Sequence, residues 1–393
     1  MATLSSETEE VNEEIVLSRP LQLDDDYPKR SPSIADMFLN LFKNIRPGAN
    51  LTSFQIPAVF NLPKSQLQCY GESVYCVRGN MLGRCNEASS PEERFSAVVG
   101  WVLSNLRPLR LGLAPYNPVL GETHHVSSGS LNVLIEQVCH HPPITALHAT
   151  DESEMIEMVW CQQAIPKFHG TGVEVEVKGK KILKLLKYGE TYAFESPNLS
   201  IKFFPPKVEW VGDVVIRCPE SGLEAELHHS SSSLFARRDR SHAVRGRIYQ
   251  KSSPTTITQL YGHWNSTVMA RKVSSGEEKV IYNAKEAIVK LRAPIVRDKE
   301  KVLASESAKM WGTVSKSIMS KDWDNAREAK SGIETKQRRI AKEMALKEQQ
   351  WIPQYFSLFF SKEEGWGCTP RLKYVLPAPI IVPLSDDQVS STR

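Results

Sequence analysis

Several features that would place a chain in a common functional class are missing from these 393 residues. No run of 18 apolar residues occurs, so we expect no membrane-spanning helix. The acidic first residues lack an apolar core, so we expect no secretory signal. Seven cysteines are scattered without a CxxC pair, which argues against a zinc ribbon and for a reducing compartment. A net charge of +4 is too small to indicate nucleic-acid binding.

The composition is that of a folded protein, and its charge is unevenly distributed. With 41% hydrophobic and 24% charged residues, the chain can bury a large core in one large domain or two modest ones. Residues 1–26 hold eight acidic residues and one basic residue, which predicts a disordered tail over residues 1–30. Residues 296–350 hold thirteen Lys or Arg and nine Asp or Glu, in a stretch whose pattern is helical.

The periodicity predicts a helix, then a long run of strands, then helices again. Apolar residues recur at three- and four-residue steps over 34–45, which is typical of a short amphipathic helix; an ordinary core-facing helix fits this pattern. From about residue 130 the period becomes two, as in the strict alternation of 173–178, and no helix interrupts the strands. This pattern predicts an antiparallel sheet, either a large barrel or a sandwich. Helices are expected over 303–320 and 321–350.

Two segments stand out chemically, Asn117–Thr123 (NPVLGET) and Glu136–Pro143 (EQVCHHPP). Two prolines must end the strand ladder after His140 and His141, so both imidazoles lie on a stiff turn that suits anion recognition or metal ligation. Adjacent histidines without HExxH or a third ligand make a zinc site unlikely. No GxSxG elbow accompanies them, and a structural role for both histidines remains an alternative.

These motifs make the chain resemble the oxysterol-binding protein family. Glu136–Pro143 matches the family fingerprint EQVSHHPP with Cys139 in place of serine, and Asn117–Thr123 matches NPxLGET. A Lys-x3-Glu-x3-Arg helix motif is present as Lys330, Glu334 and Arg338. The resemblance extends from about residue 34 to 376. The chain looks like a short, plant-like member of the family that consists of the lipid-binding domain alone.

The resemblance implies a mainly β fold with flanking helices (α+β), namely a large incomplete antiparallel β-barrel with a lipid tunnel and an N-terminal helical lid. The expected lid residues are Ile34, Phe38, Leu41 and Phe42. The expected segments are a tail over 1–30, a lipid-binding domain over 31–376 (lid 31–50, barrel 116–295, C-terminal helices 296–352) and a second tail over 377–393.

The resemblance also implies a phosphoinositide headgroup site at the tunnel mouth. His140 and His141 would contact the 4-phosphate of phosphatidylinositol 4-phosphate, Lys330 and Arg338 would contact phosphate or inositol, and the loop at Asn117 would add donors. Residues 330, 334 and 338 share one helix face, and a phosphate monoester favours such cationic donors. Since Glu334 is a poor phosphate ligand, we expect it to position Lys330 or Arg338. No catalytic residue, metal or cofactor is implied.

The chain departs from the family pattern at one position. The pattern KPxNPxLGE carries a lysine that helps bind the headgroup, and here that position is Ala114. Arg107, Arg110, His124 and His125 are nearby candidates to replace the missing cation. This departure does not change the predicted fold, but it predicts a lower affinity for the phosphoinositide.

The function implied is binding and non-vesicular transfer of lipid, sterol or phosphatidylinositol 4-phosphate, between membranes. Alternatives are a lipid-dependent sensor or scaffold and a carrier of another phospholipid such as phosphatidylserine; an enzyme is disfavoured because no nucleophile is identified. We expect a monomer in the cytosol, peripheral on membranes such as the ER or Golgi, with transient contact to the membrane surface and no nucleic-acid partner.

Overall fold

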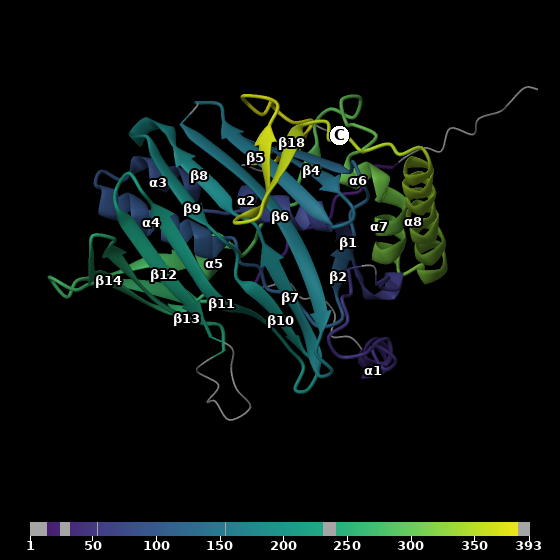
Figure 1. Cartoon of the computed structure of the whole chain (residues 1–393), viewed down its shortest axis with the longest axis horizontal. Coiled ribbons are helices and arrows are strands. Elements are labelled where there is room, and N and C mark those ends of the chain that lie inside the picture. The colour runs from purple at the N-terminus through teal and green to yellow at the C-terminus, as the bar shows by residue number, and fades with distance from the viewer. Residues whose placement is uncertain (1–13, 24–31, 53, 154, 231–240, 384–393) are drawn as a thin grey trace, which may run out of the picture.

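One curled sheet of sixteen strands dominates the computed structural model, which describes residues 14–23, 32–52, 54–153, 155–230 and 241–383 (Figure 1). Strand order follows the chain closely, from β16 at one edge through β14, β12 and β6 to β3, β20 and β17 at the other, with β8 and β9 joined to β6 and β11. Its strands are β3 (Thr123–Ser128), β4 (Leu131–Cys139), β5 (Ile144–Asp151), β6 (Ile156–Phe168), β7 (Gly172–Lys178), β8 (Lys181–Leu185), β9 (Glu190–Phe194), β10 (Asn198–Lys202), β11 (Lys207–Cys218), β12 (Leu223–His229), β13 (Ala243–Gln250), β14 (Ser253–His263), β15 (Thr267–Lys272), β16 (Glu278–Asn283), β17 (Ile295–Val296) and β20 (Ile380–Val382).

The predicted antiparallel meander is confirmed. Neighbouring strands pair antiparallel throughout this sheet except β20, which runs parallel to β3. The edge strands β16 and β17 do not pair with each other among the described residues, so the curled sheet is an incomplete barrel. Short turns carrying glycine at positive φ, such as Gly179 at +116°, let consecutive strands fold back on one another.

The C-terminal prediction needs correction. The sequence predicted a tail over 377–393, but Ile380 is fully buried and β20 joins the main sheet beside β3. Before it, β18 (Phe356–Ser361) and β19 (Gly365–Pro370) form a separate hairpin, which lies over β5 and β6 in Figure 1. Apolar Ile380, Ile381 and Val382 form a strand because an unpaired sheet edge is available to them.

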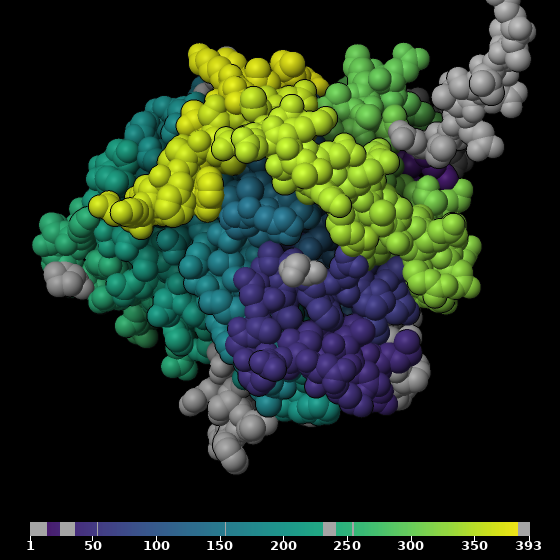
Figure 2. Space-filling model, turned by 45° about the vertical axis from the view of Figure 1, so that its right-hand side comes forward, coloured from purple at the N-terminus to yellow at the C-terminus, as the bar shows by residue number. Residues whose placement is uncertain are grey.

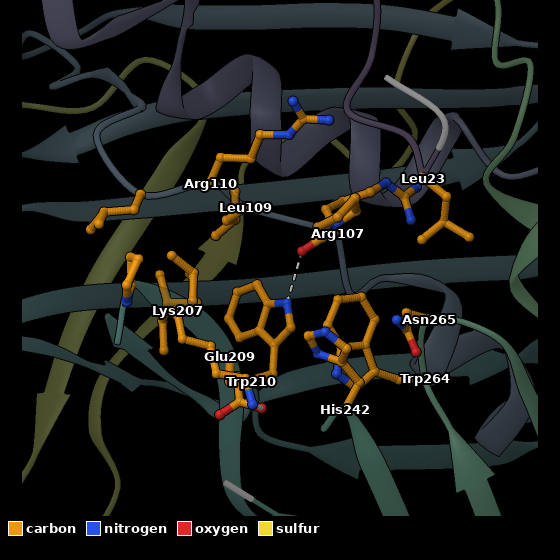
Figure 3. A pocket seen from close by; sticks show the side chains of 15 residues that line it. Leu23, Arg107, Leu109, Arg110, Lys207, Glu209, Trp210, His242, Trp264 and Asn265 are labelled. Carbon is orange, nitrogen blue, oxygen red and sulfur yellow. Dashed lines mark hydrogen bonds and ion pairs between the residues drawn. The ribbon is translucent and has the colours of Figure 1, made fainter. Parts of the chain in front are cut away.

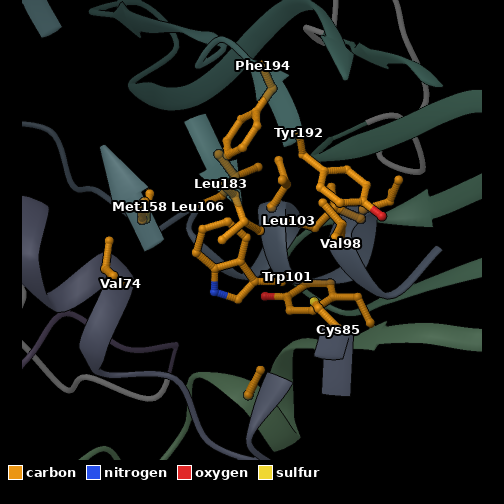
Figure 4. Close-up of a cluster of buried hydrophobic side chains, with 14 of the residues drawn as sticks. Val74, Cys85, Val98, Trp101, Leu103, Leu106, Met158, Leu183, Tyr192 and Phe194 are labelled. Carbon is orange, nitrogen blue, oxygen red and sulfur yellow. The ribbon is translucent and has the colours of Figure 1, made fainter. Parts of the chain in front are cut away.

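Helices fill the inside of the curl. α2 (Gln66–Tyr75), α3 (Met81–Glu87) and α4 (Pro91–Ser104) precede the sheet in the chain. α4 begins at a capping box in which Ser90 accepts from the backbone of Glu93, a pattern that satisfies exposed helix N–H groups. Its inner face carries Trp101, which packs among strand residues such as Tyr192 and Phe194 (Figure 4). Most of the apolar core lies between these helices and the sheet.

Residues 14–23 are packed against the body rather than part of a tail, which corrects that portion of the predicted disordered segment 1–30. Lys64, itself buried, donates to the carbonyl of Arg19 at 2.5 Å and pairs with Glu72 at 2.6 Å. The same Glu72 accepts from the backbone N–H of Leu21 at 3.2 Å. The segment is therefore fixed by a buried ion pair, each member of which also bonds to the backbone of residues 14–23. Local composition does not reveal such a long-range contact.

The predicted helix over 34–45 is shorter than expected. α1 spans Pro32–Asn40, and the chain continues in turns through residue 44. Beyond the helix the backbone bonds are of the i→i+3 type, as from Leu41 N–H to the Phe38 carbonyl at 3.1 Å. Phe38 and Phe42 are both buried in one aromatic cluster, so burial of the apolar face survives although the helix ends early.

The C-terminal helical region divides into α6 (Ser307–Met310), α7 (Gly312–Ser320) and α8 (Trp323–Leu346). These helices lie beside β1 (Asn61–Ser65) and β2 (Ala114–Tyr116), at one end of the molecule in Figure 1. None of the described helices is long and apolar enough to cross a bilayer.

Candidate functional site

The two sequence motifs meet in space. His140 directly follows β4, and the backbone of Pro118, in the loop between β2 and β3, acts to raise the pKa of its imidazole. The two segments are also joined by backbone bonds from Gly121 N–H to the Gln137 carbonyl (2.9 Å) and from Gln137 N–H to the Glu122 carbonyl (2.8 Å). We call the region formed by residues 117–122 and 136–143 the mouth.

Glu122 holds the loop of the mouth in place. Its carboxylate is fully buried and accepts from the backbone of Val119 (3.0 Å), the Ser307 hydroxyl (2.7 Å) and the Trp311 indole (2.9 Å). Burial raises the pKa of Glu122, and these hydrogen bonds act in the opposite direction. The glutamate of the NPxLGE motif is therefore structural, because all of these partners belong to the protein.

The two imidazoles are differently placed. The ring centroids of His140 and His141 are 4.6 Å apart with an edge-on orientation. His141 is exposed and His140 is half-buried, and Nδ1 of His140 is buried without a hydrogen-bond partner. Burial lowers the pKa of His140, and the neighbouring His141 lowers it further. A buried ring nitrogen without a partner would gain a hydrogen bond if a ligand placed an oxygen atom beside this turn.

The helix motif lies on α8, with its three residues at different depths. Lys330 is buried, and its ammonium contacts the Ile56 carbonyl and the Glu334 carboxylate, each at 2.7 Å. The expected positioning contact of Glu334 is thus present. Arg338 is exposed, and among the described residues its guanidinium donates only to Thr335, one turn away, at 2.9 Å. Arg338 therefore has donors left for an anionic ligand.

Gln337 is a site residue that the sequence reasoning missed. Its side-chain oxygen accepts from the backbone N–H of Leu120 at 3.2 Å, which ties α8 to the mouth. Helical spacing could have revealed it, because position 337 follows 330 by seven residues and so shares its face. Asn117 is exposed on the same loop. The structure thus gathers the histidines, the loop and the helix motif around one end of the barrel.

The segment that follows α8 is also fixed to the mouth. Glu136 is fully buried and accepts from the backbone N–H groups of Gln354 (2.7 Å) and Tyr355 (2.9 Å). Trp351 covers Gly121, where a Cβ atom would lie 2.5 Å from the indole ring. Glycine at 121, with φ of +77°, is required both by the backbone conformation and by this close approach.

Three of the four candidates to replace the missing lysine are engaged elsewhere. Arg107 is buried and donates to the carbonyls of Glu72 and Cys76. His124 lies between Glu306 (2.6 Å) and the Tyr75 hydroxyl (2.9 Å), and His125 contacts the Leu376 carbonyl at 2.8 Å. These contacts correct the expectation that they compensate for Ala114, because each serves the fold.

Two neighbouring cavities lie inside the curl of the sheet. The larger has a volume of about 430 Å³, within the usual range for small-molecule sites, and the smaller about 110 Å³. They share Arg107, Leu109 and Trp210 as wall residues, and the Trp210 indole donates to the Arg107 carbonyl at 2.9 Å (Figure 3). Four buried polar residues line the smaller cavity, namely Arg107, Gln162, Lys181 and His229. Burial lowers the pKa of Lys181 to about 8 and that of His229 to about 4.

The predicted lid residues cover an apolar cluster next to the larger cavity. Phe42 contacts the rings of Phe38, Phe54, Phe168 and Phe203, with centroids 5.0–5.6 Å apart. Leu41 is partly buried in the same cluster; Ile34 falls within α1, but its side chain is outside the described part. Leu111 belongs to this cluster and also lines the larger cavity. The segment 36–45 is therefore packed as a closed lid would be.

Comparisons with known proteins agree with this architecture. The family model described as "Oxysterol-binding protein" matches residues 39–370. The chain belongs to the oxysterol-binding protein family. Within this family, it is 47% identical to oxysterol-binding protein-related protein 4B of Arabidopsis thaliana over 380 residues, covering 95% of this chain and 99% of the relative. It is 45% identical to protein 4A of the same plant, covering 96% and 99%.

Two solved family structures share the fold. The Osh1 ORD domain in complex with cholesterol superposes with a TM-score of 0.72 at 21% identity, covering 91% of each chain. The Osh3 ORD of Saccharomyces cerevisiae in complex with PI(4)P superposes with a TM-score of 0.64 at 18% identity, covering 91% of this chain and 95% of the other. This chain therefore shares its incomplete barrel with flanking helices with both solved domains.

Proposed function

We propose that this chain binds one lipid at a time inside its barrel and transfers it between membranes, with sterol and phosphatidylinositol 4-phosphate as the two cargoes. The observation that carries the proposal is the pair of backbone hydrogen bonds that join Gly121 and Glu122 to Gln137, because it places a paired-histidine turn beside the loop that α8 supports. A phosphate monoester carries about 1.5 to 2 negative charges near neutral pH, and His140, His141, Lys330 and Arg338 would receive it there, with Glu334 positioning Lys330.

The interior supports a second, mostly apolar ligand. The larger cavity is bounded by Leu109, Trp210 and Trp264, which suit a lipid body, and also by the charged side chains of Arg110, Lys207 and Glu209 (Figure 3). In the smaller cavity both ring nitrogens of His229 lack hydrogen-bond partners among the described residues, so a lipid hydroxyl would find a polar partner there. The family members solved with cholesterol and with PI(4)P bind the same two classes of ligand.

The proposal contains no covalent step. Cys139 is the nucleophile next to the histidines in the sequence, but burial raises the pKa of its thiol, and a thiol that stays protonated is a poor nucleophile. A lipid sensor would use the same site without release, and a phosphatidylserine carrier would use the same interior. We assign the protein to the cytosol as a monomer that visits membranes such as the ER or Golgi.

An exchange assay between vesicles tests the proposal. Donor vesicles carry a fluorescent sterol and acceptor vesicles carry phosphatidylinositol 4-phosphate, and transport of each lipid should accelerate the other. The double variant His140→Ala/His141→Ala should lose phosphoinositide transfer and keep basal sterol transfer, which the phosphoinositide no longer accelerates. The matched control His169→Ala/His228→Ala replaces two exposed histidines, 52% and 61% accessible, and should keep both. Equal loss of both lipids in a folded His140/His141 variant would contradict the proposed headgroup site.

A further inference from the structure

The surface between residues 346 and 376 is unusually apolar. Seven of the seventeen large apolar side chains that are exposed in the described residues lie in this short stretch. Leu346 is 76%, Ile352 73% and Phe360 61% exposed. An exposed cluster of this kind is uncommon unless it serves an interaction, and packing within the described fold does not explain it.

This apolar stretch is held firmly in position. Trp351 packs on Gly121, and Glu136 fixes the next turn of chain through the backbone of Gln354 and Tyr355. Phe360 lies on the hairpin β18–β19, where the centroid of its ring is 5.2 Å from that of Trp366. The exposed side chains are therefore presented by an anchored segment, and they begin directly beside the mouth.

Positive charge lies mainly on the part of α8 that precedes this stretch. Residues 336–345 contain four Lys or Arg and one Asp or Glu, whereas residues 346–376 contain four Lys or Arg and three Asp or Glu. Together they carry four more basic than acidic residues. This excess of four equals the formal net charge of the whole chain, so the remaining residues together are neutral. Apolar side chains with Lys and Arg around them match a bilayer that carries anionic headgroups.

We infer that residues 336–373 form a docking surface for membranes that contain anionic lipids. In Figure 2 the second half of α8 and the segment leading to the hairpin form one continuous band, which lies next to the N-terminal segment that includes α1. Leu346, Ile352 and Phe360 enter the interfacial layer, and Trp351 lies at headgroup level, as indole rings do. Docking on this band brings the mouth and the lid to the bilayer.

The role of this surface in lipid transfer rests on the proposed function. Its binding to a bilayer does not, because that binding can be measured without any transfer. The full chain is mixed with vesicles of phosphatidylcholine alone or of phosphatidylcholine with phosphatidylserine, and bound protein is separated by flotation. We expect binding to the anionic vesicles, weakened by added salt as headgroup attraction is screened. If the wild-type chain does not bind the anionic vesicles, the inference is overturned, and the surface of residues 336–373 would instead bind a protein partner.

The decisive variant is Ile352→Asp/Phe360→Asp, which removes two apolar groups from the band without touching the mouth. Losing their burial in the interface should weaken binding to anionic vesicles by about tenfold or more. The control Val273→Asp/Val280→Asp changes two side chains of similar exposure, 51% and 54%, at the opposite edge of the sheet, and should bind as the wild type does. Equal binding by all three proteins, or equal loss in both variants, overturns the inference.

A solution assay separates this result from the proposed function. Binding of a fluorescent sterol without vesicles should be the same in the wild type and in both variants, which also confirms that they are folded. Sterol binding without vesicle binding overturns the docking surface and leaves the proposed cargo intact. Vesicle binding that depends on Ile352 and Phe360, in a chain that takes up neither cargo, supports the docking surface and overturns the transfer function.

Discussion

The backbone N–H of Leu120 donates a hydrogen bond to the side-chain oxygen of Gln337 at 3.2 Å. Leu120 lies in the loop beside His140, and Gln337 lies on the helix that carries Lys330, Glu334 and Arg338. This one contact spans 217 positions of sequence and joins the two halves of the proposed headgroup site. The contact of Trp351 with Gly121 joins the same two parts, and we expect both contacts to set the placement of the imidazoles relative to the helix cations.

Replacing Gln337 with leucine should therefore loosen the site. The partly buried Leu120 N–H would lose its acceptor, which should lower the free energy of unfolding by about 1–3 kcal/mol and weaken phosphoinositide binding. Chemical denaturation and titration with a short-chain phosphoinositide would measure both effects. Ser331→Leu, at an exposed position of the same helix, serves as the control. Unchanged phosphoinositide affinity in Gln337→Leu would show that the headgroup does not depend on this tie.

Restoring the family lysine should strengthen phosphoinositide binding. Ala114 lies at the start of β2, three residues before Asn117, and a charge-assisted hydrogen bond contributes about 1.5–3 kcal/mol. Ala114→Lys should thus raise the affinity by about tenfold or more, while Ala114→Met, with similar bulk and no charge, should leave it unchanged. Calorimetric titration of both variants measures the difference. Identical affinities in the two would mean that position 114 does not face the headgroup.

Phosphoinositide binding should become stronger as the pH falls. Burial and the neighbouring His141 lower the pKa of His140 in the free protein, and a bound phosphate dianion raises it by favouring the imidazolium. A ligand that raises the pKa binds best below the free-state pKa, and this gain is lost as the pH rises through the bound-state pKa. Phosphoinositide affinity should therefore change over a pH range that begins below about 6.5, the ordinary histidine pKa, and ends at the higher pKa of His140 in the complex.

Calorimetry in two buffers of different ionisation enthalpy would show proton uptake on binding. The phosphate itself titrates near pH 6, so the comparison with His140→Gln isolates the contribution of the histidine. We expect the variant to bind more weakly with a shallower pH profile. Parallel profiles in both proteins would assign the pH dependence to the lipid alone.

The lid should open more readily when its central ring is removed. Phe42 contacts four other phenylalanines, and truncating a buried phenylalanine to alanine costs about 3–5 kcal/mol. In Phe42→Ala we expect faster amide hydrogen exchange over residues 36–45, unchanged exchange in the main sheet and faster release of bound sterol. Met37→Ala, at a side chain that is 52% exposed, should match the wild type. Uniformly faster exchange across the sheet would indicate a core segment rather than a lid.

Much of the architecture could be predicted from local sequence pattern. The strict alternation of 173–178 predicted a half-buried strand, and β7 occupies that stretch with antiparallel neighbours on both sides. The paired prolines after His141 correctly ended β4. The helix spacing of Lys330 and Glu334 predicted a shared face, and their side chains meet at 2.7 Å. Each of these features depends on residues close together in the chain.

The tertiary structure alone decided the remaining features. Residues 14–23 are fixed because Glu72 and the buried Lys64 bind their backbone, and β20 forms because β3 offers an unpaired edge. Lys330 reaches the carbonyl of Ile56, and Trp351 covers Gly121. Periodicity reports which face of a segment is apolar, but it does not report which distant segment will lie against that face. The sequence by itself therefore determined the strands, the histidine turn and the family, whereas long-range contacts determined how the mouth is assembled and what surrounds it.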